Sequence, residues 1–158
     1  MKNVFFLIFS LLFVCCQHST DIDDYPNTGK SSVKIDNTEY AGSAYLSSLK
    51  IENYNFRTII LELDDTTKIE ILSEQFDEGI FDCNPTQSCV IFSLKYDRLY
   101  KTFYSAEEGF LYLKKVTSEQ IVGEFDVVIF DVASSCSNCP ESLKKTKGKF
   151  NAIQERTF

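Results

Sequence analysis

Hydrophobic and polar residues alternate along most of the chain, in short runs rich in β-branched and aromatic side chains. In one such run Val90, Phe92 and Leu94 would share one face of a strand. Asp, Asn, Gly and Pro separate the runs at intervals of roughly ten residues, a spacing typical of antiparallel sandwiches and barrels. The candidate runs are Val33–Ile35, Thr38–Tyr40, Ser43–Ile51, Thr58–Leu63, Lys68–Leu72, Gly79–Asp82, Ser88–Tyr96, Leu99–Ser105, Phe110–Val116, Gln120–Val132 and Thr146–Ile153. This pattern predicts an all-β domain, an antiparallel meander of about nine to ten strands that forms a sandwich or a calycin-like barrel.

The turn residues and glycines refine this pattern. Asp36-Asn37 predicts a hairpin turn, and Glu107-Glu108-Gly109 predicts a turn that divides two strands. Lys68–Phe76 fits either a helix face or strand alternation, so its structure stays open. Gly123 and Gly148 each lie two residues before a phenylalanine, which indicates a bulge or a close approach of another backbone.

The N-terminus has the layout of a targeting signal. Lys2 precedes Val4–Cys16, a run that is apolar except for Ser10 and is shorter than the roughly 20 residues of a membrane span. The run ends at Cys15-Cys16, which resembles a bacterial lipoprotein signal, where cleavage precedes a cysteine that carries diacylglycerol. We expect residues 1–15 to be the signal and Cys16 to be lipidated, with Cys15 as the alternative. An ordinary cleaved signal is the other interpretation.

Residues 16–32 are polar, acidic and rich in turn formers, and they predict a flexible tether before a domain over residues 33–158. The acidic stretch just after the cysteines resembles the surface-export signal of Bacteroidota lipoproteins. Acidic residues also keep a linker solvated, so both interpretations stay open.

Composition and charge exclude several functions. The 158 residues include 23 acidic and 16 basic side chains, for a net charge of -7. Phosphate backbones attract clustered Lys and Arg, so we expect no nucleic-acid partner. The single histidine, His18, lies in the tether, which leaves the domain without a multi-histidine metal centre or a Ser-His-Asp nucleophile. We therefore expect no catalysis, no cofactor and no metal.

Four predicted strand segments, each of which contains a turn or a glycine, carry a family resemblance. They are Val33–Tyr40, Gly109–Leu113, Ile121–Phe125 and Gly148–Asn151. In this order, after a lipoprotein signal, they resemble an uncharacterised family of small Bacteroidota lipoproteins. The resemblance implies an extracytoplasmic location and an all-β domain, and it transfers no catalytic residue.

Four cysteines lie in the domain: Cys83, Cys89, Cys136 and Cys139. An even count in an exported protein predicts disulfides. We favour the two local pairs, 83 with 89 across a hairpin loop and 136 with 139, while the cross-pairing that would join the two loops stays open. C-x2-C also occurs in thiol–disulfide oxidoreductases and zinc sites, but too few residues follow Cys139 for a supporting helix, and an oxidising compartment disfavours zinc.

Tyrosines provide a candidate binding surface. Tyr100 and Tyr104 share one face of a predicted strand, and Tyr112 follows closely. Such residues could bind a sugar or a protein, because tyrosine offers rigid area and a hydroxyl group. Cross-strand packing within the sheet is the alternative use of these rings.

Charged residues on two predicted strands have competing interpretations. Glu124 and Asp126 share one strand face, where they could serve catalysis or Ca²⁺ binding or lie solvated. Lys145, Lys147 and Lys149 also share one face. They could meet an anionic partner, but we favour a lysine-rich edge strand that resists aggregation.

Together these features predict a lipoprotein anchored to the bacterial outer membrane and exposed to the periplasm or the cell surface. We expect it to be a non-catalytic binding or structural module, whose partners are the membrane, through its lipid, and an envelope protein or glycan. The alternative is a small-ligand carrier with a calycin-like barrel.

Overall fold

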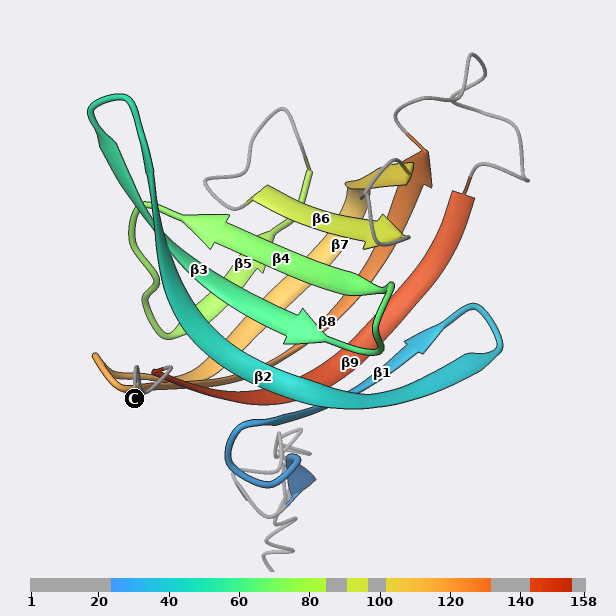
Figure 1. Cartoon of the computed structure of the whole chain (residues 1–158), viewed down its shortest axis with the longest axis horizontal. Coiled ribbons are helices and arrows are strands. Elements are labelled where there is room, and N and C mark those ends of the chain that lie inside the picture. The colour runs from blue at the N-terminus through green and yellow to red at the C-terminus, as the bar shows by residue number, and fades with distance from the viewer. Residues whose placement is uncertain (1–23, 85–90, 97–101, 132–142, 155–158) are drawn as a thin grey trace, which may run out of the picture.

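The computed structural model describes residues 24–84, 91–96, 102–131 and 143–154, which form nine β-strands (Figure 1). The strands are β1 (Lys30–Ile35), β2 (Thr38–Ile51), β3 (Tyr54–Glu62), β4 (Lys68–Ser73), β5 (Gly79–Asp82), β6 (Ile91–Tyr96), β7 (Thr102–Val116), β8 (Gln120–Asp131) and β9 (Leu143–Gln154). Eight of them, all except β5, close into an antiparallel barrel in the order β1-β2-β3-β4-β6-β7-β8-β9, because β9 pairs back onto β1. The predicted all-β fold is confirmed, and the closed barrel is calycin-like.

The hairpin turn predicted at Asp36-Asn37 is confirmed. Ile35 lies opposite Thr38, so two residues make the whole loop, and Asp36 has a φ of 51°. Such a two-residue loop between paired strands fits the left-handed conformation that Asp and Asn tolerate. The ambiguous stretch from Lys68 begins as a strand, β4, rather than as a helix.

The turn predicted at Glu107-Glu108-Gly109 is wrong. β7 runs unbroken through these residues, and its register with β8 shifts between Ala106 and Glu108. The bulge takes up an extra residue without ending the strand. Gly109 has a φ of 124°, and a Cβ there would lie 2.2 Å from the Asp126 carbonyl oxygen, so only glycine fits this approach of two backbones.

The folded domain begins earlier than the predicted boundary at residue 33. The Gly29 N–H donates to the Asn151 carbonyl at 2.7 Å, and the Ala44 N–H donates to the Gly29 carbonyl at 2.9 Å. These bonds place Gly29 between β2 and β9, and β1 follows from Lys30. Residues 30–32 of the predicted tether therefore belong to the barrel wall. Their polar sequence, Lys-Ser-Ser, concealed this, although Ser31 is buried.

Large apolar side chains fill the described interior of the barrel. The most deeply buried are Leu46, Ile59, Leu61, Ile69, Ile71, Phe92, Leu94, Leu111, Leu113, Ile121, Ile129 and Phe150. Phe125 is 2% exposed and joins two of these rings, with its centroid 5.0 Å from that of Phe92 and 6.4 Å from that of Phe150. An eight-stranded barrel has an interior just wide enough for side chains to fill, and this core is of that kind.

Two glycines make room for these rings. Gly123 lies opposite Phe150 across the β8–β9 ladder, and Gly148 lies opposite Phe125. A Cβ at Gly148 would lie 2.8 Å from Cζ of Phe125, and one at Gly123 would lie 2.9 Å from Cζ of Phe150. A Cβ would also lie 2.6 Å from the Tyr112 carbonyl oxygen at Gly123 and 2.9 Å from the Ser32 carbonyl oxygen at Gly148, so the close backbone approach predicted for both glycines is confirmed.

The β2–β3 hairpin extends past its neighbour. Its last pairs, Leu49 with Phe56 and Ile51 with Tyr54, have no counterpart in the β3–β4 pairing, which begins at Arg57. In Figure 1 this ribbon rises beyond the barrel, on the side away from the N-terminal segment below β1 and β2.

Candidate functional site

Arg57 spans one end of the barrel. It lies on β3 opposite Ser73, and its guanidinium donates to the carbonyls of Thr117 and Ser118, the latter at 2.8 Å, in the β7–β8 turn. Burial lowers the pKa of Arg57 from its ordinary value. Because β3 and the β7–β8 turn lie on opposite sides of the eight-strand barrel, Arg57 connects the two sides of the barrel at this end.

Several hollows open on the surface of the described residues, and two of them form the candidate site. The first, which we call the outer groove, has a volume of about 470 Å³ and crosses β7, β8, β9 and the β1–β2 hairpin. Its lining residues are Ser32, Val33, Lys34, Glu39, Phe110, Glu124, Phe125, Asp126, Lys147, Gly148 and Lys149. Ser32 on β1 and Gly148 on β9 are small, and longer side chains surround them. The hollow therefore arises where small residues lie on adjacent strands.

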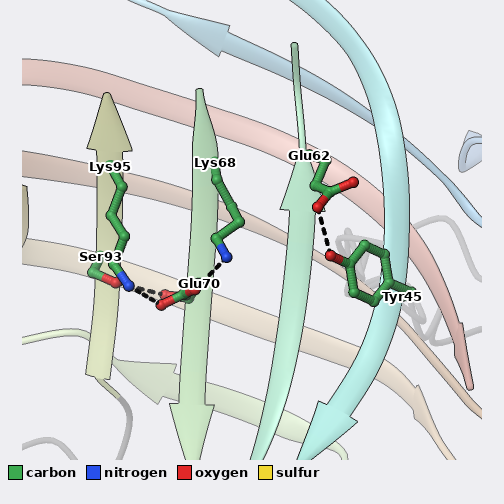
Figure 2. Close-up of polar contacts among 6 residues, drawn as sticks. All are labelled: Tyr45, Glu62, Lys68, Glu70, Ser93 and Lys95. Carbon is green, nitrogen blue, oxygen red and sulfur yellow. Dashed lines mark hydrogen bonds and ion pairs between the residues drawn. The ribbon is translucent and has the colours of Figure 1, made fainter. Parts of the chain in front are cut away.

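The second hollow, of about 890 Å³, lies between the N-terminal segment 24–27 and strands β1 to β3. It shares Ser32 and Lys149 with the outer groove, so the two hollows are neighbours on one surface. Its far side carries Glu62, whose carboxylate accepts a hydrogen bond of 2.6 Å from the Tyr45 hydroxyl (Figure 2).

Lysines and carboxylates face one another in the outer groove at distances too long for hydrogen bonds. Lys34 is 3.9 Å from Glu39, and Lys149 is 3.9 Å from Glu124. Lys147 lies directly opposite Lys34 across the β1–β9 ladder. Like charges at opposed positions destabilise a sheet, but each lysine also faces a carboxylate across its other ladder, Glu39 opposite Lys34 and Asp126 opposite Lys147.

The lysines of β9 do not protect an edge, and that prediction is wrong. β9 pairs with β8 along one side and with β1 along the other. The alternation of Lys145, Lys147 and Lys149 correctly marks outward positions, but they lie in the middle of the wall, where no free edge needs protection. The contact of these lysines with an anionic partner stays a prediction.

A second charge cluster on the outer wall has the opposite character (Figure 2). Glu70 lies between Lys68, at 2.7 Å, and Lys95, which also donates to it. Burial alone would raise the pKa of Glu70, but the hydrogen bonds from both lysines outweigh it and hold the pKa below its usual value. Glu70 thus forms short ion pairs with both lysines, and we call these three residues the ion triad. In the outer groove, by contrast, the lysines and carboxylates are only loosely paired.

The N-terminal segment is docked against the groove. The ring of Tyr25 has the ammonium groups of Lys149 and Lys114 at 5.2 and 5.3 Å from its centroid, within the range of cation–π contacts. Burial, the charge of Glu124 and a hydrogen bond with Glu124 raise the pKa of Tyr25 to about 12. The amide of Asn151 donates to the Pro26 carbonyl at 3.3 Å, so main chain and side chain are both held.

The three tyrosines of the predicted surface do not come together as one described site. Tyr112 lies on β7 opposite Glu124 and is half-buried, next to the outer groove. Tyr104 pairs with Leu94 in the β6–β7 ladder, and its side chain lies outside the described residues, as does Tyr100. Tyr112 is the one of the three whose side chain the structure describes, and it adjoins that surface.

The carboxylates Glu124 and Asp126 both lie on the outer wall, opposite Lys149 and Lys147 respectively. In the described part of the chain, no group of three or more His, Cys, Asp and Glu residues is placed to hold a metal ion. Each of the two carboxylates faces a lysine across the β8–β9 ladder, and Glu124 is 3.9 Å from Lys149.

Cys83 is a free thiol, buried at the end of β5, and burial followed by the charge of Asp82 raises its pKa to about 12. The structure gives no support to the disulfide predicted for it. The other three cysteines of that prediction, Cys89, Cys136 and Cys139, lie outside the described residues, as do Cys15 and Cys16. Their pairing and lipidation stay predictions.

Sequence reasoning missed Tyr25, Phe110 and Lys34 as members of the site. Phe110 occupies an outward position of β7 and is 42% exposed, which its alternation with Leu111 indicated. Tyr25 lay in a segment interpreted as tether, and nothing local to it predicts contact with lysines 114 and 149.

Fold and site define a closed all-β barrel with a filled core and a charged hollow on its outer wall. Comparison of the chain with known families, with curated proteins and with solved structures gives no match. Among the described residues, no helix is long and apolar enough to cross a membrane.

Proposed function

We propose that this protein is a lipid-anchored, non-catalytic binding module of the cell envelope, which takes its ligand in the outer groove. One observation carries the proposal. The described interior is packed with apolar side chains, whereas the outer groove combines an accessible hollow of about 470 Å³, an exposed Phe110 ring and charges paired no closer than 3.9 Å. Loosely paired charges lose little when a ligand replaces their partners.

The anchor would be Cys16, with Cys15 as the alternative, at the end of the apolar run after Lys2. Several acyl chains would hold the protein durably, since each buried CH₂ contributes roughly 0.8 kcal/mol. Tyr25 is held on the barrel and lies nine positions after Cys16. An extended chain of that length spans about 30 Å, so the anchor would keep the barrel close to the membrane surface.

The eight-stranded, calycin-like architecture favours one second candidate, a small-ligand carrier. A carrier needs a central cavity for its ligand. Phe92, Phe125 and Phe150 occupy the described interior and are each at most 2% exposed, so we rank the carrier below the binding module.

Blocking the groove tests the proposal. Ser32→Trp would fill the groove floor, and Asn55→Trp on the projecting hairpin is a matched control, because both serine and asparagine are exposed there. Binding of each full-length variant to purified cell-wall glycan and, separately, to solubilised envelope proteins would be measured by interferometry. We expect at least a tenfold loss for the groove variant with one of these probes and none for the control. Equal binding by both variants would overturn the groove as the binding site.

The anchor has its own test, radioactive palmitate labelling of cells that express Cys16→Ala or Cys15→Ala. We expect the first substitution to abolish labelling and the second to preserve it. Labelling that survives Cys16→Ala would move the lipid to Cys15, and labelling absent from the parent chain would remove the anchor from the proposal.

A further inference from the structure

We propose that the ligand of the outer groove is an acidic polypeptide segment that carries an aromatic residue. This inference rests on the proposed function and names the chemistry of its ligand. The protein's own segment around Tyr25 serves as a template for this ligand. It contains an acidic residue, Asp24, next to an aromatic one, and it binds to the wall beside the groove.

The template uses two kinds of contact. The Tyr25 ring lies under the ammonium groups of Lys149 and Lys114, 5.2 and 5.3 Å away, and Asp24 precedes it in the chain. The Asn151 amide donates to the main-chain carbonyl of Pro26, and the Gln120 amide holds Asn151 in turn, at 2.7 Å. Two lysine ammonium groups thus bind the Tyr25 ring, and the buried Asn151 amide hydrogen-bonds the main chain of the segment.

The outer groove offers the first of these two kinds of contact again, since lysines and an exposed aromatic ring line it. Lys147 and Lys34 lie opposite one another in the β1–β9 ladder, at the centre of a row that Asp126 and Glu39 flank, so a ligand carboxylate between the two lysines would reduce their mutual repulsion. Lys147 faces Asp126 across the β8–β9 ladder without forming a close ion pair among the described residues, and Lys34 is 3.9 Å from Glu39. Phe110 forms the opposite wall and is 42% exposed, which offers an apolar surface to an aromatic side chain.

A glycan is the competing occupant, and the groove fits it less well. Apart from Ser32 the polar side chains of this groove are charged, and a neutral sugar brings no charge that could replace the loosely paired partners of its lysines. Glu39, Glu124 and Asp126 also line it, so a ligand that carried only negative charge at every unit would meet repulsion. A peptide can place carboxylates against lysines and uncharged residues elsewhere.

The test is fluorescence anisotropy of the full-length protein with a fluorescein-labelled ten-residue peptide of Asp, Glu and Tyr. Lys147→Glu reverses the central charge of the groove, and Lys50→Glu makes the same charge change on the exposed hairpin. Circular dichroism verifies that both variants fold. We expect saturable binding that Lys147→Glu weakens at least tenfold, that Lys50→Glu preserves, and that weakens as ionic strength rises.

An oligogalacturonate probe separates this inference from the proposed function. Binding of that glycan but not of the peptide, with the same sensitivity to Lys147→Glu, would overturn the peptide ligand and support the groove as a binding site. Peptide affinity that is equal in the two variants, or no peptide binding at all, would overturn the inference, while the Ser32→Trp measurement judges the proposed function independently.

Discussion

Replacing Phe125 by alanine tests whether the barrel is a packed core or a ligand cavity. The ring is 2% exposed, and its centroid lies 5.0 Å from that of Phe92 and 6.4 Å from that of Phe150. Burying a phenylalanine removes roughly 150–250 Å² from water. At about 25 cal/mol per Å² this corresponds to about 4–6 kcal/mol, of which the alanine keeps part. We expect Phe125→Ala to lower the free energy of unfolding by about 3–5 kcal/mol, the usual range for such a cavity.

Urea unfolding followed by far-UV circular dichroism measures this loss, since the chain has no tryptophan to report it by fluorescence. Phe110→Ala is the matched control, because that ring is 42% exposed on the outer wall and should cost less than about 1 kcal/mol. A loss below about 1 kcal/mol for Phe125→Ala would refute the reasoning, because a ring that lines an open cavity leaves no new void when it is removed.

Three further predictions follow from single residues. Gly109→Ala should destabilise the barrel by about 1–3 kcal/mol or more in urea unfolding, because its φ of 124° is strained for alanine and the new Cβ meets the Asp126 carbonyl; an unchanged midpoint would contradict this. The pKa of Glu70 is lowered from 4.5, so the ionised carboxylate stabilises the fold above that pH, and this contribution is lost as the pH falls further. The difference in free energy of unfolding between the parent and Glu70→Gln should therefore narrow on acidification. A difference that stays constant with pH would exclude the ion triad. Cys83, with its pKa raised to about 12, should resist a thiol reagent at pH 8 in the native protein and react in denaturant without reductant; a need for reductant would place it in a disulfide.

The strands could be predicted from the sequence because alternation identifies the inward and outward positions of each run. The closed barrel could not be chosen over the sandwich, because closure depends on which distant strands pair. Gly123 and Gly148 came nearest to revealing it. Their close approach to other groups was predicted, but the seating of Phe150 and Phe125 opposite them becomes apparent only from the β8–β9 register.

The candidate site was predicted only in fragments for the same reason. The alternation of Lys147 and Lys149 marked an outward face, yet their place beside β1 depends on a strand more than a hundred residues away in the chain. Tyr25 lies in a segment of turn-forming and acidic residues, and its contact with Lys114 and Lys149 has no local signal. Local patterns thus specified strands, while the groove arises from pairing between distant ones.

The measurement that tests the account most directly is a backbone-amide NMR titration of the full-length, isotope-labelled protein with the acidic peptide and, separately, with oligogalacturonate. The account predicts that the ligand which binds will shift resonances of the outer groove, around Ser32, Lys34, Asp126 and Lys147, and leave the core around Phe92 unchanged. Shifts concentrated in the core, with the groove resonances unchanged, would contradict the account and would place the binding site inside the barrel.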